Sequence, residues 1–340
     1  MTVARPLSIL STGMVCAVGL NVPSACAAIR AGLTNPTESR FLDGDGEWVM
    51  VHRVPLEHPW NVKLGKMAAA AVSECMGPLS PQQRQATPVL LCLSDSLGAS
   101  VNSGLEVDVP AAVASELGIS LAPHSAVVAR GRSGVGYALR RARELLYESG
   151  VPAVVIAATD SLLTGPTLSL LTKARRLLTP QNSNGFIPGE GAAAVLLGAG
   201  AGGRVVCNGI GMSVEPAPID SDRPLRAEGL VAAIRDALAE AGCRMHDMDL
   251  RVADLSGEQY YFKEATLAVS RLLRARKEQF DLWHPAQSVG ETGAAAGLIA
   301  LVVADTALRK GYAPGPSILT HISADGGDRV AAILRLGARA

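Results

Sequence analysis

The sequence lacks the features that mark two large classes of protein. Basic and acidic residues balance at 31 each in 340 residues, so no net charge would attract nucleic acid or an anionic membrane surface. Asp160 and Asp305 interrupt the two longest apolar runs, so no uncharged stretch reaches the roughly 20 residues that a membrane-spanning helix needs. These absences argue against nucleic-acid-binding and integral-membrane proteins. They predict a soluble globular protein of the cytoplasm.

Clustered metal ligands and paired cysteines are also missing. The six cysteines lie far apart without a CxxC pair, and the histidines form no cluster, which indicates neither a zinc site nor a disulfide framework. We therefore expect free thiols in a reducing compartment, no metal and no cofactor. The cysteines are Cys16, Cys26, Cys75, Cys92, Cys207 and Cys243. The acidic stretch Asp43–Glu47 lacks the ligand spacing of an EF-hand, so it predicts a turn between two strands.

The N-terminus has the order of a secretory signal, because Arg5 precedes an apolar run from Pro6 to Leu20 and the small residues Ser24 to Ala28. Serine, threonine and glycine interrupt that run between residues 8 and 13, which argues against a signal peptide. The segment Ile9–Met14 predicts a buried first strand with a tight turn after it.

Apolar runs typical of strands alternate with segments rich in alanine, leucine and arginine, whose apolar residues recur at three-to-four spacing. This alternation predicts an α/β layered architecture. The predicted strands are Val89–Leu93, Val151–Ala157, Ala192–Leu197, Val205–Ile210, Leu250–Leu255, Phe280–His284 and Val330–Leu336. The predicted helices are Ser24–Gly32, Leu64–Met76, Val109–Leu117, Gly134–Ser149, Arg226–Ala241, Lys263–Arg276 and Gly293–Lys310. The glycine-rich segment Gly198–Gly203 predicts a boundary between an N-terminal half, residues 1–200, and a C-terminal half, residues 201–340.

The two halves resemble each other where a small-residue helix opens. Arg132–Leu139 begins one such helix, which leads into the strand Val151–Ala157. Glu291–Leu298 begins the other, which ends at Gly311 before the final strands. Because small residues let helices pack closely, this repeat predicts a duplicated fold in which the two helices meet at a pseudo-twofold centre.

Several segments, spread over almost the whole chain, carry one family resemblance. Ser288–Gly297 reads Ser-Val-Gly-Glu-Thr-Gly-Ala-Ala-Ala-Gly, and Gly185–Leu197 contains Gly-Phe-Ile-Pro-Gly-Glu-Gly-Ala. Ser11–Gly19, Ala157–Asp160 and Ser323–Asp328 add further matches. These motifs resemble those of the β-ketoacyl synthase and thiolase-like superfamily. The resemblance implies a five-layer α-β-α-β-α fold built from two pseudo-repeats.

The resemblance also implies four positions for chemistry, and this chain departs from the family at each of them. The family's nucleophilic cysteine, at the N-terminus of the first buried helix, corresponds to Arg132. Its two histidines, which stabilise a thioester oxyanion and assist decarboxylation, correspond to Ser256, or alternatively Leu255, and to Glu291. Its gatekeeping phenylalanine corresponds to Asp325. The chain therefore resembles a degenerate branch that lacks the Cys-His-His triad, with no catalytic residue.

Two alternatives stay open at this site. Arg132 and Glu291 either form a charge-assisted pair across the old active site or each point to solvent. Ser133, the only hydroxyl in its turn, either caps the helix or acts as a nucleophile, although Gly131–Val135 lacks the second glycine of a nucleophile elbow. Three aspartates later in the chain form no convincing acid-base pair: Asp247, Asp249 and Asp254.

Three functions are compatible with this pattern. The favoured one is a non-catalytic adaptor or chaperone, because Ala253–Tyr261 resembles the Asp-Leu-Asn-Gly-Glu variant of degenerate ketosynthase-like proteins, some of which accompany type VI secretion effector genes. Its partner would be a secretion effector, a spike protein or a companion chaperone. The second is a chain-length-factor-like partner of an active ketosynthase, with an acyl carrier protein as a further partner. The third is an acyltransferase that uses Ser133 or Ser256 with Glu291 as base. All three predict a homodimer, with the strand Val151–Ala157 at its edge.

Overall fold

The computed structural model describes residues 5–95 and 105–337, within which ten strands form one continuous sheet in the order β10-β9-β11-β12-β8-β1-β7-β6-β4-β5. The first half supplies β1 (Leu7–Cys16), β4 (Val89–Leu93), β5 (Ala126–Ala129), β6 (Val154–Ser161) and β7 (Glu190–Ala199). The second half supplies β8 (Val205–Val214), β9 (Leu250–Ala253), β10 (Leu282–Trp283), β11 (Ser317–Ser323) and β12 (Asp328–Leu336). A separate small sheet pairs β2 (Thr37–Leu42) with β3 (Trp48–Val51).

The same pairing pattern occurs twice in the large sheet. In the first half β1–β7 and β7–β6 are antiparallel, whereas β6–β4 and β4–β5 are parallel. In the second half β8–β12 and β12–β11 are antiparallel, whereas β11–β9 and β9–β10 are parallel. Antiparallel pairing of β1 with β8, from Leu7–Cys207 to Ile9–Val205, joins the halves. The two halves of the chain therefore have the same strand order and the same strand directions. The division into two domains at residue 200 stays a prediction.

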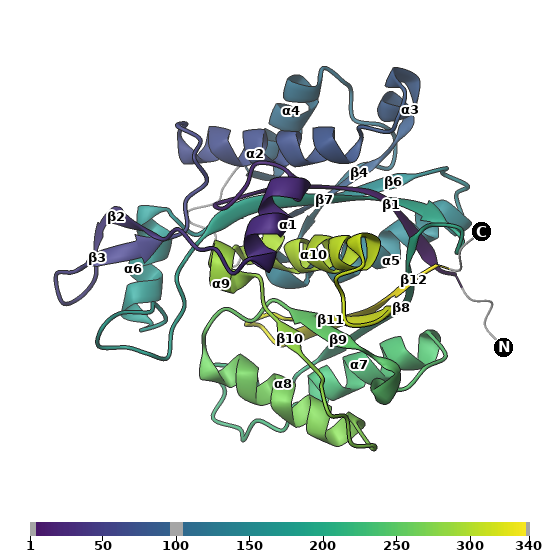
Figure 1. The fold of residues 1–340 in the computed structure, drawn as a ribbon. Helices are drawn as coiled ribbons and strands as arrows, with labels where there is room; N and C mark the ends of the chain where they lie inside the picture. Colours follow the sequence, from purple (N-terminus) through teal and green to yellow (C-terminus); the bar gives the residue numbers. More distant parts are fainter. Residues whose placement is uncertain (1–4, 96–104, 338–340) are drawn as a thin grey trace.

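Figure 1 shows that the sheet folds into two layers with helices between and outside them. On one outer face lie α2 (Trp60–Cys75), α3 (Pro81–Ala86) and α4 (Leu105–Leu117), and on the other α7 (Glu228–Glu240) and α8 (Gln259–Leu272). Between the layers lie α1 (Val22–Arg30), α5 (Gly134–Tyr147) and α10 (Ala296–Lys310). The remaining helices are α6 (Gly165–Lys173) and α9 (Ala286–Val289). This arrangement confirms the predicted five-layer α/β fold.

The central helix α10 is enclosed on all sides. Its residues from 297 to 308 are all buried, as expected of a helix that is apolar all round. Its one carboxylate, Asp305, accepts from Nε of Arg309 at 2.7 Å, one turn further along the helix. The buried negative charge is therefore compensated within the helix.

Glycines allow the two central helices to approach their surroundings closely. A Cβ atom at Gly297 of α10 would lie 2.8 Å from Ile322 of β11 and 2.9 Å from Val135 of α5. A Cβ atom at Gly136 of α5 would lie 2.6 Å from Val330 of β12. The small residues were expected to serve contact between the helices, but they serve contact with the strands of the second half as well.

All predicted strands and helices overlap elements of the structure. The predictions omitted β5, β11, α3, α6 and α9. β11 mixes serine, threonine and histidine with apolar residues, yet all seven of its residues are buried, because helices cover both faces of its sheet. The Asp43–Glu47 turn is confirmed, since Oδ1 of Asp43 accepts from the N–H groups of Asp45 and Glu47 at 2.9 Å. All six cysteines are free. No helix in the described ranges is long and apolar enough to cross a membrane.

The expected dimer edge is wrong. The strand predicted at Val151–Ala157 is β6, which pairs with β4 on one side and with β7 on the other. Its backbone groups are therefore taken up within the sheet, and it cannot add a further strand. The strands at the ends of the sheet are β5 and β10.

Candidate functional site

Two short turns meet between the sheet layers. The turn Gly131–Ser133 precedes α5, and the turn Gly293–Ala295 precedes α10. Each begins with a glycine of positive φ, 52° in one and 55° in the other, a conformation that glycine adopts without strain. The two halves therefore use the same backbone shape at this point. These turns bring together two of the positions predicted from the sequence, Arg132 and Glu291.

Arg132 is buried here and bound by a carboxylate from the other half of the chain. Its Nε and Nη2 atoms lie 3.0 and 2.8 Å from Oδ2 of Asp254, and Nη2 lies 3.1 Å from the Asp254 carbonyl oxygen. The guanidinium also lies 5.0 Å from the centre of the Tyr261 ring. Burial acts to lower the pKa of Arg132, but the carboxylates of Asp254 and Glu291 outweigh it and raise that pKa. Arg132 is therefore a permanent cation.

Glu291 lies beside the same guanidinium. Its Oε2 atom is 3.5 Å from Nη1 of Arg132, and its Oε1 atom accepts from the N–H of Gly293 at 2.9 Å. Burial raises the pKa of Glu291 to about 6, although Arg132 and the nearby Ser256 hydroxyl act to lower it. Within the described residues neither Oε2 of Glu291 nor the Ser256 hydroxyl completes a hydrogen bond. The carboxyl group is thus only partly compensated.

Of the two alternatives left open for Arg132 and Glu291, the structure has the charge pair, with Asp254 as the closer partner of Arg132. Both side chains are buried and face each other, so the solvent-directed arrangement is wrong. The group that accepts two N–H groups of Arg132 is Asp254, for which no role was predicted. Its position in the sequence could have indicated this role. Asp254 directly follows β9, and functional side chains often lie where parallel strands end.

A second arginine completes the network. Nε and Nη2 of Arg176 each lie 2.7 Å from a carboxylate oxygen of Glu258. Nη1 of Arg176 and the hydroxyl of Tyr261 both donate to Asp325. Burial acts to raise the pKa of Asp325, but hydrogen bonding from Arg176 and the charge of Arg132 outweigh it and lower the pKa to about 2. The position that corresponds to the gatekeeping phenylalanine is therefore an ionised member of a salt-bridge network.

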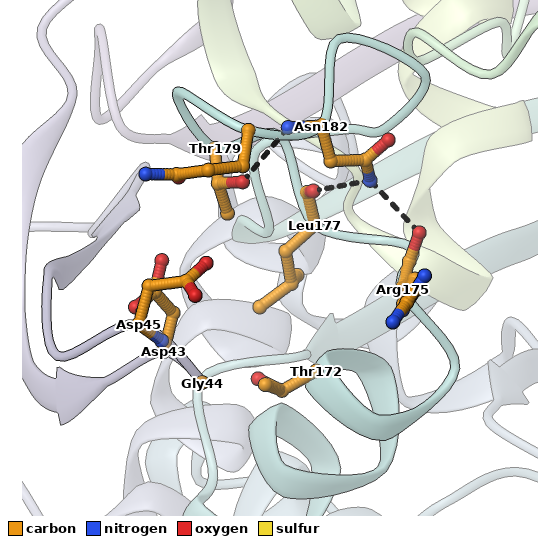
Figure 2. Close-up of a pocket in the computed structure, with 9 residues that line it drawn as sticks. Asp43, Gly44, Asp45, Thr172, Arg175, Leu177, Thr179 and Asn182 are labelled. Atoms are coloured by element: carbon orange, nitrogen blue, oxygen red, sulfur yellow. Dashed lines mark hydrogen bonds between the residues drawn. The ribbon is translucent and has the colours of Figure 1, made fainter.

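Asn182 holds the loop that carries Arg176 (Figure 2). Its Nδ2 atom donates to the carbonyl oxygens of Arg175 and Leu177 at 2.8 and 2.9 Å, and its N–H donates to Oγ1 of Thr179 at 3.1 Å. These bonds fix the backbone on both sides of residue 176. Sequence reasoning missed Arg176, because nothing in its neighbours indicates that it turns inward. In the described part of the chain, no cluster of histidine, cysteine and carboxylate side chains could hold a metal ion.

Asp160, near the end of β6, shapes the turn before α10. Its two carboxylate oxygens accept from the N–H groups of Ala294 and Ser161, each at 2.8 Å. A Cβ atom at Gly293 would come within 2.2 Å of Oδ2, which explains why glycine stands there. Burial raises the pKa of Asp160 to about 6, although both N–H groups act to lower it. The motif Ala157–Asp160 therefore fixes the backbone of the turn that precedes α10.

The hydroxyl and the thiol near the start of α5 lack the surroundings of a nucleophile. Ser133 is buried, and its Oγ atom lies 2.9 Å from the carbonyl oxygen of Arg130 and 3.0 Å from Oδ2 of Asp328. It caps no N–H group of α5, so the predicted capping role is wrong. Cys92 of β4 lies under the same turn, but burial raises the pKa of its thiol to about 12. A thiol that stays protonated is a poor nucleophile.

The space left at the site is small and charged. A cavity of about 210 Å³ is lined by side chains of both signs, among them Arg130, Arg132, Arg176, Asp160, Glu291 and Asp325. Pockets for small molecules usually span about 300–1,000 Å³ and are mainly apolar. The space left at this site is therefore smaller than a usual small-molecule pocket, and charged side chains from both halves of the chain line it.

Replacing Glu291 with glutamine should stabilise the protein at pH 8 and not at pH 4.5. The pKa of Glu291 rises from 4.5 to about 6 on folding, so the folded state binds the proton more tightly. Stability contributed by this group is then lost as the pH rises from 4.5 through 6, by about 2 kcal/mol. Urea unfolding at both pH values measures the difference. The control is E38Q at an exposed position of β2. A variant less stable than the wild type at pH 8 would show that attraction to Arg132 dominates.

Comparison with known proteins places the fold. No family model matches the chain. Two proteins of Streptomyces coelicolor match part of it. "Actinorhodin polyketide putative beta-ketoacyl synthase 2" is 31% identical over 208 residues, which are 56% of this chain and 49% of that protein. "Putative polyketide beta-ketoacyl synthase 2" is 29% identical over 203 residues, 55% of this chain and 48% of that protein. The matches thus span about half the length of these relatives.

Solved structures match nearly the whole chain. A complex of a type II polyketide acyl carrier protein with its ketosynthase, AntDE:AntF, gives a TM-score of 0.82 at 15% identity over 98% of this chain and 100% of that one. The ketosynthase ApeO with its chain length factor ApeC, from Xenorhabdus doucetiae, gives a TM-score of 0.79 at 16% sequence identity over 98% of both chains. The ishigamide ketosynthase/chain length factor gives a TM-score of 0.78 at 17% sequence identity over 99% of this chain and 100% of that one. The chain therefore has the thiolase-like fold of ketosynthases and chain length factors.

Proposed function

We propose that this chain is a non-condensing subunit of the ketosynthase fold, which acts beside a separate ketosynthase as a chain length factor does. The observation that carries the proposal is the buried guanidinium of Arg132, held by Asp254 where the family resemblance places the nucleophile. A guanidinium stays protonated and cannot attack a thioester. Carbon–carbon bond formation would then belong to the partner.

The groups around Arg132 support the same conclusion. The positions that correspond to the two family histidines hold Ser256 and Glu291. A carboxylate repels the oxyanion of a thioester intermediate, whereas catalysis of that reaction needs hydrogen-bond donors aimed at it. Asp325 adds a second carboxylate on the same side. The arrangement is suited to hold the two halves of the fold together, because the guanidinium groups of Arg132 and Arg176 are already bound by carboxylates.

The edge strand β5 supports association with a protein of the same fold. Among the described residues β5 pairs only with β4, so its outer side carries no ladder partner. Its residues, Ala126 to Ala129, are all apolar and exposed or partly exposed. An apolar strand at a sheet edge is a template for the addition of another strand. A ketosynthase, or a second copy of this chain, could extend the sheet there.

The names of the similar proteins point the same way. Two of the structural neighbours are described as a ketosynthase with its chain length factor, and another as a ketosynthase with its acyl carrier protein. The sequence relatives are described as β-ketoacyl synthase 2 of polyketide systems. These descriptions support a protein partner and leave its identity open.

A second candidate is the adaptor or chaperone role, for a secretion effector. This candidate rests on the segment Asp254–Glu258, which resembles the variant of degenerate ketosynthase-like proteins and supplies two acids of the network. Asp254 binds Arg132, and Glu258 binds Arg176. The motif is thus used to fill the site, which supports a non-catalytic protein and is equally compatible with either partner.

Affinity purification of the tagged chain from its native cells, with mass spectrometry of the copurified proteins and of the intact bait, tests the proposal. We expect an active ketosynthase among the partners and an unmodified bait, because Arg132 cannot carry an acyl group and the nearby thiol of Cys92 is buried and protonated. Incubation with an acyl N-acetylcysteamine thioester provides a second test for an adduct. The variants S133A and C92S serve as controls, since loss of an adduct in either would locate it.

Each other outcome has a defined meaning. An acyl adduct on the wild-type chain would overturn the non-condensing assignment. A secretion effector or chaperone, with no ketosynthase, would support the second candidate. Recovery of a second copy of this chain alone would indicate a homodimer and would contradict the ketosynthase pairing.

A further inference from the structure

A second cavity, which shares no lining residue with the charged site, lies between α1, α10 and the segment from β10 to α9. Figure 1 shows α1, α9 and α10 together beside the layer that contains β10. The cavity has a volume of about 570 Å³, within the range usual for small-molecule sites. It is thus more than twice as large as the space left at the old active site.

Aromatic and aliphatic side chains form one wall of this cavity. The rings of Trp283 and Tyr312 are stacked, with centroids 6.1 Å apart and planes inclined by 21°. Ile29, Leu282 and Val303 extend the apolar surface. Flat apolar molecules stack favourably against such a wall.

Arg30 supplies an uncompensated positive charge at the same cavity. Its guanidinium carbon lies 4.3 Å from the centre of the Tyr312 ring, and the side chain makes no ion pair or hydrogen bond with any described residue. No acidic residue is among those that line the cavity. By contrast, Arg132 and Arg176 are each bound by carboxylates. The edge of a guanidinium stacked on a ring keeps its N–H groups available for a planar anion.

We propose that this cavity binds a small anion with a flat apolar body, of the aromatic carboxylate class. The ring of such a molecule would lie against Trp283 and Tyr312, and its carboxylate would accept from Arg30. The Ser288 hydroxyl and the Gln287 amide, which make no side-chain hydrogen bond with described residues, also line the cavity and can donate to the anion. A neutral ligand would leave Arg30 unpaired, and a cation would be repelled by it.

Binding of 4-nitrobenzoate to the full chain tests the proposal. The sequence has three tryptophans, so the variant W48F/W60F retains Trp283 alone. Calorimetry should show saturable one-to-one binding, and the fluorescence intensity of Trp283, corrected for absorption by the ligand, should fall, because a nitroaromatic ring stacked on indole quenches it. The substitution Arg30→Gln should weaken binding at least tenfold. Neutral 4-nitrobenzamide should bind at least tenfold more weakly than the carboxylate to the wild type, and R30Q should not change its affinity.

Arg235→Gln is the matched control, because Arg235 is an exposed arginine of α7 that lies outside the cavity. It should leave the affinity for 4-nitrobenzoate unchanged. Three results would each overturn the proposal: no saturable binding by the wild type, equal affinity of R30Q and the wild type, or an unchanged corrected fluorescence intensity of Trp283 at saturation. Thermal unfolding of R30Q establishes that a loss of affinity is not a loss of fold.

Discussion

Replacing Arg132 with methionine should lower the free energy of unfolding by about 3–5 kcal/mol, the effect expected when one partner of a buried ion pair is removed. Methionine keeps much of the side-chain volume but leaves the carboxylate of Asp254, whose side chain is 0% exposed, without its cation. Glu291 loses its nearest positive charge as well. Urea unfolding followed by circular dichroism measures the change. The control is Arg5→Met, which removes an exposed ion pair with Glu148 and should change stability by less than about 1 kcal/mol.

A double variant keeps this prediction testable if R132M does not fold. In R132M/D254N the uncompensated charge is gone, and the asparagine oxygen can still accept from the N–H of Ser323, as Asp254 does. The double variant should therefore be more stable than R132M alone. An R132M protein as stable as R5M would contradict the conclusion that the network helps to hold the two halves of the fold together. A double variant less stable than the single one would contradict the role assigned to Asp254.

Replacing Arg329 with methionine, at a different place in the fold, should also lower the free energy of unfolding by about 3–5 kcal/mol. Arg329 and Glu264 form an ion pair in which both side chains are 0% exposed, with 2.7 Å between Nε and Oε1. The guanidinium also donates to the carbonyl oxygens of Ala324 and Asp328 and to the hydroxyl of Tyr260. The substitution would therefore leave the carboxylate of Glu264 buried without a cation, and it would remove the contacts that hold the loop between β11 and β12.

Hydrogen exchange separates these two consequences. The N–H groups of Ala324 and Gly327 bond within the loop that Arg329 holds, and they should exchange faster in R329M than in the wild type. The variant R329K preserves charge but cannot reproduce all four contacts, so it should lose less stability than R329M and should still loosen the loop. Unchanged protection of the loop in R329M would show that the ion pair stabilises α8 and β12 only. The double variant R329M/E264Q should recover part of the lost stability.

The arginines show how far prediction from the sequence reached. The family resemblance singled out Arg132 from the sequence alone, by its distance from Ala138 and Leu139 in the helix that follows. Its partner was not visible, since Asp254 lies 122 residues away in the other half. Arg176 and Glu258 are 82 residues apart, and Arg329 and Glu264 are 65 apart. Charges in a sequence do not indicate which of them will be enclosed.

The prediction that Val151–Ala157 forms the edge of a dimer was wrong for a related reason. Residues Val151–Ala157 have the apolar composition of a strand, and that composition is the same for a strand at the centre of a sheet as for an exposed one. β6 became central only because β4 and β7 pair with it on both sides, although the first paired residues are 66 positions apart for β4 (Val89 and Val155) and 43 for β7 (Val154 and Leu197). Strand order is a property of the assembled sheet.

Local patterns in the chain are sufficient to predict the alternation of strands and helices and the two small-residue helices, because each depends on neighbours within a few residues. Tertiary structure alone decides that Arg132 is paired with Asp254, that Arg329 is paired with Glu264, and that Arg30 is left uncompensated beside Trp283 and Tyr312. The physical reason is that a charge is stable in the interior only where a partner comes within hydrogen-bonding distance, whereas Arg30 is exposed and can stay hydrated, and packing of the two halves determines which charges are enclosed.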